Sequence, residues 1–124
     1  MPKVNSRSAL DRVEAAGFEG HYGQAGPYTI GFEAYTEHAD LAPLFVGLPG
    51  DRCQSAHWGY VLEGRLVYHT AAGDEEFVAG DAYYVGPGHT PEIFAGTRVV
   101  EFSPTAELER TLEVVTRNME ATGG

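Results

Sequence analysis

The chain has 124 residues, of which 43% are hydrophobic and 21% charged, and this balance excludes a disordered or collagen-like chain despite 16 glycines and 7 prolines. The length allows one domain, and a single cysteine, Cys53, excludes an internal disulfide framework. A formal net charge of −10 disfavours binding to nucleic acids and to anionic membranes.

The first segment, residues 1–26, is expected to be a polar lead-in with a short helix. Ser8 would cap this helix, and Leu10, Val13 and Ala16 would lie on one side of it. The segment lacks the apolar stretch of a secretory signal, and no apolar run approaches the roughly 20 residues of a membrane span. We therefore expect a cytoplasmic protein.

Residues 27–103 are expected to form a barrel of short strands. Hydrophobicity alternates with a period of two after Pro27, which predicts a half-buried strand over 28–35, and 41–48 is a second apolar stretch. Further strands are predicted over 58–62, 66–68, 77–78, 82–85 and 98–102. The turns between several of them are Glu63-Gly64, Gly73-Asp74 and Gly80-Asp81. Such short, closely spaced strands are typical of an antiparallel sandwich or barrel.

Residues 104–124 are expected to form a helix with a short tail. Ser103 is a capping residue, and Pro104 suits the first helical position. One apolar stripe follows at helical spacing, consisting of Leu108, Leu112, Val115 and Met119. This pattern favours a helix that covers the outside of the barrel or forms a dimer seam.

Three side chains able to bind a metal lie in the barrel segment. Cys53 and His57 are four residues apart, and His89 follows Gly88 in a turn-rich stretch. Thiolate and imidazole suit zinc, iron, copper or nickel, whereas calcium and magnesium prefer oxygen ligands. Spacing alone leaves open whether these three residues meet.

Two stretches, from Asp51 to Gly64 and from Gly80 to His89, resemble the two motifs of a small single-domain cupin. The resemblance covers about residues 40–104. Its more specific half is the second, a Gly-Asp turn, a short strand and a Pro-Gly turn. The resemblance implies an all-β, cupin-type β-barrel or jelly roll of two antiparallel sheets, here with a C-terminal helix. It also implies a metal or ligand in the barrel mouth and a homodimer.

The metal-ligand positions of the first motif hold atypical residues. Counted back from Gly64, the usual glutamate position holds His57. The two usual histidine positions hold Cys53 and Asp51. The site would therefore be rebuilt from ligand-capable residues of other types.

The second motif departs from the family pattern as well. Its proline position holds Gly86, and its histidine position holds Pro91. His89 stands two residues before Pro91, and residues two apart on a strand point to the same face. We therefore expect His89 to point inward.

Our leading hypothesis is a divalent transition metal, zinc, iron, nickel or copper, held by His57, His89 and Cys53. Asp51, Glu92 and Glu101 are the candidates for an additional oxygen ligand or an acid/base group. Such a protein would bind or transform a small organic molecule, with oxygenase, isomerase and cyclase chemistry all open.

Two alternatives are kept beside this hypothesis. In the first, the barrel is a metal-free module that binds or senses a small ligand. Its cavity walls would be Trp58, Tyr60, Tyr83 and Tyr84. In the second, Cys53 and His57 form a nucleophilic pair, although no oxyanion-hole signature accompanies them.

Overall fold

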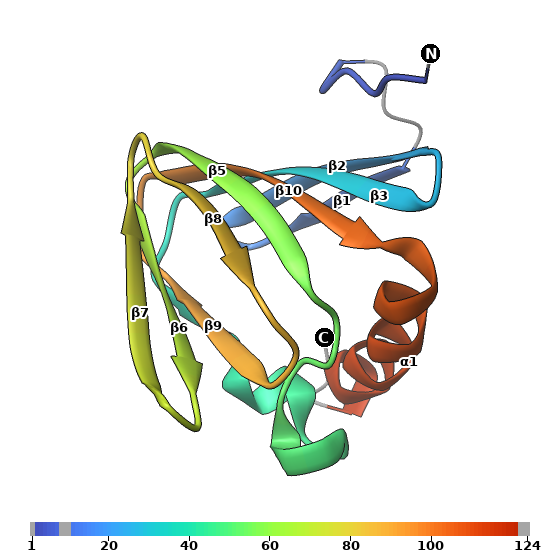
Figure 1. The fold of residues 1–124 in the computed structure, drawn as a ribbon, viewed down its shortest axis with the longest axis vertical. Coiled ribbons are helices and arrows are strands. Elements are labelled where there is room, and N and C mark those ends of the chain that lie inside the picture. The colour runs from blue at the N-terminus through green and yellow to red at the C-terminus, as the bar shows by residue number, and fades with distance from the viewer. Residues whose placement is uncertain (1, 8–10, 122–124) are drawn as a thin grey trace.

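The computed structural model describes residues 2–7 and 11–121, which form two facing antiparallel sheets with a helix beside one open end (Figure 1). The larger sheet has the strand order β1-β2-β3-β10-β5-β8. Its strands are β1 (Asp11–Ala15), β2 (Phe18–Ala25), β3 (Tyr28–Tyr35), β5 (His57–Glu63), β8 (Ala82–Val85) and β10 (Thr97–Pro104).

The smaller sheet has the order β4-β9-β6-β7 and faces the larger one. Its strands are β4 (Ala39–Asp40), β6 (Arg65–Thr70), β7 (Gly73–Val78) and β9 (His89–Ile93). Two short 3₁₀ helices, η1 (Ala42–Phe45) and η2 (Pro49–Asp51), precede β5, and α1 (Thr105–Ala121) follows β10. The predicted strands over 28–35 and 82–85 have the same bounds as β3 and β8, whereas the apolar stretch 41–48 contains η1.

The core lies between the two sheets, where alternate residues of each strand point inward. Its buried side chains are Tyr35, Val61, Leu66, Tyr68, Tyr83, Val85, Ile93 and Val99. Three tyrosines are therefore enclosed in the barrel, and their hydroxyl groups need buried partners. For Tyr68 and Tyr83 this partner is the carboxylate of Glu101.

The expectation of a polar lead-in with a short helix is wrong for the residues that the structure describes. Val13 lies in strand β1, opposite Gly20 of β2, and both strands extend the larger sheet beyond β3. The expected start of that helix, at Ser8 and Leu10, lies outside the described residues. Tertiary pairing outweighs the weak helical spacing here, because β1 gains a full antiparallel ladder with β2.

The turn between β5 and β6 depends on Gly64. Its φ of +79° is in the left-handed region that favours glycine. A Cβ atom at this position would lie 2.7 Å from the Cα of Thr97. The predicted Glu63-Gly64 turn is thus confirmed, and the backbone of β10 leaves no space for a side chain there.

The helix α1 confirms the predicted C-terminal helix, but its apolar stripe is only partly covered, since Leu108 and Val115 are half-buried. Leu112 and Met119 are 44% and 43% exposed, whereas Thr111 is 2% exposed. Asn118 donates hydrogen bonds of 2.8 Å to the carbonyls of both Leu44 and Val46. The packed side of α1 therefore includes the polar residues Thr111 and Asn118, and Asn118 pairs with carbonyl groups around η1.

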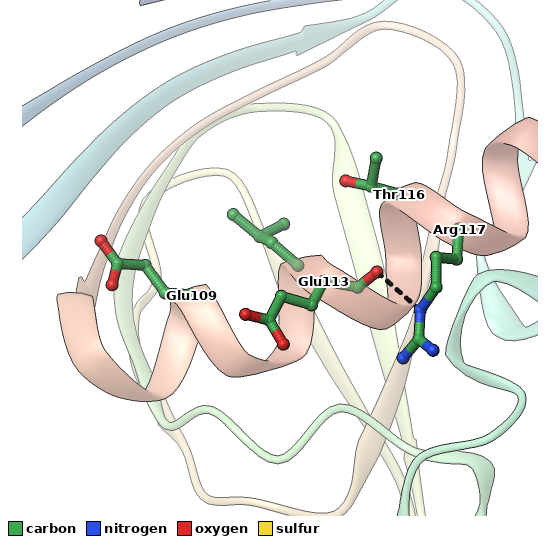
Figure 2. A pocket seen from close by; sticks show the side chains of 5 residues that line it. Glu109, Glu113, Thr116 and Arg117 are labelled. Atoms are coloured by element: carbon green, nitrogen blue, oxygen red, sulfur yellow. Dashed lines mark hydrogen bonds between the residues drawn. The ribbon is translucent and has the colours of Figure 1, made fainter.

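The solvent side of α1 carries Glu109, Leu112, Glu113, Thr116 and Arg117, which line a shallow depression along the helix (Figure 2). The guanidinium of Arg117 donates to the main-chain carbonyl of Glu113. In the described part of the chain, no helix combines the length and hydropathy that crossing a membrane requires.

A candidate metal centre

Cys53 and His89 meet at one end of the barrel through direct backbone pairing. The amide of Cys53 donates to the carbonyl of His89 at 2.7 Å, and the amide of Gly88 donates to the carbonyl of Cys53 at 2.7 Å. Both side chains are buried, with exposures of 3% and 0%. The loop before β5 and the first residue of β9 are thereby joined, although 36 positions separate them in the sequence.

The orientation of the His89 ring is set by its first nitrogen. Its Nδ1 donates to the carbonyl oxygen of Gly86 at 2.6 Å, which leaves Nε2 with a free lone pair. Nε2 is buried and finds no hydrogen-bond partner among the described residues. A buried, unpaired polar atom is costly, so this nitrogen is suited to bind a further group.

His57 begins β5 and points into the barrel from the facing sheet. Its Nδ1 lies 2.7 Å from the hydroxyl of Ser103 and 3.5 Å from a carboxylate oxygen of Glu101. Its Nε2 lies 3.6 Å from the sulfur of Cys53. The ring is thus fixed from one side by groups of β10 and presents its other nitrogen to the thiol.

The three atoms Cys53 Sγ, His57 Nε2 and His89 Nε2 suit one transition-metal ion. The possible ligand atoms of these residues all lie within 4.8 Å of one another. A tetrahedral site with metal–nitrogen distances of about 2.0–2.1 Å and a metal–sulfur distance of about 2.3 Å separates its ligands by about 3.5 Å. The 3.6 Å between Cys53 and His57 fits this spacing. The chain supplies three such ligands here.

Burial keeps both Cys53 and His89 uncharged. It raises the pKa of the Cys53 thiol to about 11 and lowers the pKa of His89 to about 4. A protonated, enclosed thiol is a poor nucleophile, which disfavours the Cys53–His57 nucleophilic pair. A metal ion would instead displace the thiol proton, while neutral His89 is already in its ligating form.

The predicted oxygen residue Glu101 points into the barrel but lies on the far side of His57 from the sulfur. One carboxylate oxygen accepts hydrogen bonds from the hydroxyls of Tyr68, at 2.6 Å, and of Tyr83. The ring of Tyr83 reaches this oxygen by crossing over Gly59, where a Cβ atom would collide with it. Glu101 is therefore placed to orient His57 rather than to join the three ligand atoms.

A second inward carboxylate, Glu33 on β3, has no counterpart among the predicted site residues. It accepts a 2.5 Å hydrogen bond from the hydroxyl of Tyr22. Burial and the nearby charge of Glu101 raise the pKa of Glu33 to about 7. Its inward direction could have been found from the sequence, because Glu33 lies two residues before Tyr35, a core residue on the same strand.

The other two predicted oxygen residues lie away from the cluster. Asp51 is exposed in η2, where its side chain accepts a hydrogen bond from the amide of Gly47. Glu92 binds His38 at 2.6 Å and His69 at 2.8 Å through its two oxygens. Asp51 lies outside because it belongs to the turn of η2. Glu92 lies outside because alternate residues of β9 point away from the core.

The aromatic residues predicted to line the cavity separate into two sets. Tyr83 is buried in the packed core between the two sheets. Trp58, Tyr60 and Tyr84 are 41%, 43% and 54% exposed and lie on the outer face of the larger sheet, so that prediction is wrong for them. Their strands place His57, Gly59 and Tyr83 inward, and the alternation therefore turns the neighbouring aromatic residues outward.

No protein-family model matches the chain, and no curated protein sequence matches it either. Similar solved structures include a protein of unknown function from Rhizobium leguminosarum, with a TM-score of 0.59 and 24% identity over 83% of this chain and 95% of the other. An RmlC-like cupin from Shewanella frigidimarina has a TM-score of 0.55 and 15% identity over 82% and 88% of the two chains. The chain folds as a small cupin.

A third similar structure, a sugar phosphate isomerase of the cupin superfamily from Silicibacter pomeroyi, has a TM-score of 0.53 and 14% identity over 83% and 75% of the two chains. At these identities the likeness concerns the fold. The fold predicted from the two motifs is confirmed. The comparisons say nothing about the cluster of Cys53, His57 and His89, which follows from the side chains of this chain alone.

Proposed function

We propose that this cupin binds one divalent transition metal, zinc, iron, nickel or copper, through Cys53, His57 and His89. The observation that carries the proposal is the buried Nε2 of His89, which has no hydrogen-bond partner and converges with two other ligand atoms. A metal bound there would act as a Lewis acid toward a small organic molecule. The proposal extends to binding or transformation of such a molecule at the barrel mouth.

The residues around the cluster prepare it for this role. The carbonyl of Gly86 holds Nδ1 of His89, and Ser103 with Glu101 holds Nδ1 of His57. Partners of this kind fix the tautomer of a ligating histidine and increase its basicity. The set of one sulfur and two nitrogens favours a borderline or soft metal over calcium or magnesium.

Metal content and cobalt spectroscopy of protein purified without a metal-affinity tag test the proposal. We expect close to one equivalent of metal, loss of metal in His89→Phe, and a thiolate-to-cobalt charge-transfer band that disappears in Cys53→Ala. The matched control is His38→Gln, because His38 is a surface histidine bound to Glu92. Metal far below one equivalent, unchanged by His89→Phe, would contradict the proposal.

The alternative of a metal-free binding module is supported by a cavity of about 260 Å³ between α1 and the segment that precedes β5. Metal-stripped protein would then bind small organic molecules in a thermal-shift screen, and a chelator would leave this binding intact. Binding that requires added metal would exclude this alternative.

We also propose that the protein is a homodimer that uses the outer face of the larger sheet. Exposed aromatic residues lie there on four strands that are neighbours in the sheet, β3, β10, β5 and β8. They include Tyr28, Trp58, Tyr60, Tyr84 and Phe102, and the ring of Trp58 contacts those of Tyr28 and Tyr84. A contiguous apolar face of this kind is unusual for a monomer, and a second copy would cover it with the same surface.

A further inference from the structure

The side of α1 that carries Glu107 and Thr111 packs against the segment that supplies the Cys53 ligand. These two helix residues are one turn apart and therefore lie on the same side of α1. The carboxylate of Glu107 accepts a 3.2 Å hydrogen bond from the amide of Ala56, three residues after Cys53. Thr111, at 2% exposure, is the buried residue of the helix.

The hydroxyl of Thr111 is enclosed beside the Cys53 thiol without a hydrogen bond. A threonine inside a helix commonly donates to the main-chain carbonyl three or four residues earlier, but the Thr111 oxygen has no partner among the described residues. Burial raises the pKa of the Cys53 thiol, and the nearby Thr111 hydroxyl opposes this rise. The sulfur itself lies 3.9 Å from the carbonyl oxygen of Ser55 and 3.6 Å from Nε2 of His57.

A metal ion in the cluster would give partners to two buried atoms at once. Within the described part of the chain, Oγ1 of Thr111 and Nε2 of His89 are the buried side-chain atoms without a hydrogen bond, and both belong to residues beside Cys53. A thiol is a weak acceptor, whereas a metal-bound thiolate carries negative charge and accepts a stronger hydrogen bond. The metal would coordinate His89 and also make the Cys53 sulfur an acceptor for Thr111, which removes the cost of both unsatisfied atoms.

We propose that Thr111 is a positioning residue of the metal centre, whose hydroxyl donates a hydrogen bond to the metal-bound sulfur of Cys53. The inference rests on the proposed function, because the acceptor is the metal-bound sulfur. It extends the centre from the barrel to the C-terminal helix. Groups that hydrogen-bond to metal ligands orient those ligands, and their loss typically lowers metal affinity by about 10–100-fold.

The test compares cobalt-loaded wild type with Thr111→Val and Thr111→Ser. Valine keeps the shape of threonine without its hydroxyl, whereas serine keeps the hydroxyl. In Thr111→Val we expect cobalt affinity to fall by about tenfold or more. We also expect the thiolate-to-cobalt charge-transfer band to move to lower energy, because a hydrogen bond stabilises the sulfur electrons that are transferred. Thr111→Ser should restore the band, and the matched control Thr116→Val, on the solvent side of α1, should leave it unchanged (Figure 2).

The position of the band separates a positioning role from a packing role. Loss of packing alone would lower stability or affinity, but it would leave the band of the cobalt-saturated protein in place. The same band energy in wild type and in cobalt-saturated Thr111→Val would therefore overturn this inference and leave the metal site intact. Absence of any thiolate-to-cobalt band in the wild type would overturn both the proposed function and this inference.

A crystal structure of the cobalt-loaded wild type decides the question if Thr111→Val fails to fold. We expect Oγ1 of Thr111 within hydrogen-bond distance of the cobalt-bound sulfur of Cys53. A Thr111 hydroxyl that instead pairs with another group, or that lies beyond hydrogen-bond distance of the sulfur, would overturn the proposal.

Discussion

Replacing Glu33 by glutamine removes a carboxyl group that the fold keeps protonated. Burial and the charge of Glu101 raise the pKa of Glu33 from an ordinary value of 4.5 to about 7. Glutamine has nearly the same shape as the protonated acid and keeps an oxygen for the hydroxyl of Tyr22. Its effect on stability should therefore come from the lost ionisation alone.

The sign of the pH dependence follows from which state binds the proton. Between pH 4.5 and about 7 the folded chain keeps the Glu33 proton, whereas the unfolded chain has released it. The contribution of this group to stability is complete below pH 4.5 and is lost as the pH rises to about 7. At about 1.4 kcal/mol for each unit of pKa, the loss amounts to at most about 3.5 kcal/mol.

The assay is urea unfolding of the metal-free protein, with wild type and Glu33→Gln compared at each pH from 4.5 to 8.5. Titrations of other groups cancel in the difference between the two free energies of unfolding. We expect this difference to be near zero at pH 4.5 and to favour the variant by up to about 3.5 kcal/mol above pH 7. Glu75→Gln, at an exposed position on β7, should show no such trend. A pH-independent difference would refute the reasoning.

Two further predictions concern the outer sheet face and the β5–β6 turn. Trp58→Lys should shift the sedimentation coefficient from that of a dimer to that of a monomer. The control Val78→Lys, on β7 of the other sheet, should leave the coefficient unchanged. A monomeric wild type would contradict the dimer proposal. Gly64→Ala should lower the unfolding free energy by about 1–3 kcal/mol and by more than Gly80→Ala. Both glycines have positive φ, but only Gly64 faces a backbone atom at close range, so equal losses would contradict this explanation.

Much of the barrel follows from local sequence signals. Alternating hydrophobicity sets the bounds of β3 and β8, and Gly64 marks a turn that only glycine fits. The motif spacing also picks out Cys53, His57 and His89, which the fold brings together. Strand β9 is harder to find in the sequence, because Pro91 interrupts a pattern that would otherwise indicate a strand.

Local sequence signals do not show which face of a strand points into the barrel. Strand β5 carries hydrophobic residues on both sides, and a period of two does not say which side meets the other sheet. Trp58 and Tyr60 are the larger side chains, yet the inward positions are those of His57 and Gly59. The absence of a side chain at Gly59 is what lets Tyr83 reach Glu101. This close approach depends on the neighbouring strand β8, and the sequence of β5 alone does not show which strand will lie beside it.

By itself, the sequence determined that the chain is a small cupin barrel with a C-terminal helix and three ligand-capable residues near its mouth. Only the tertiary structure decided that His89 leaves one nitrogen unpaired and that Glu101 lies beside Nδ1 of His57. It also decided that Thr111 is the buried residue of α1, while Leu112 and Met119 of the apolar stripe are exposed. The physical reason is that periodicity and turn chemistry act between residues close in the chain. Unsatisfied atoms, shifted pKa values and cavities arise where segments distant in the chain meet.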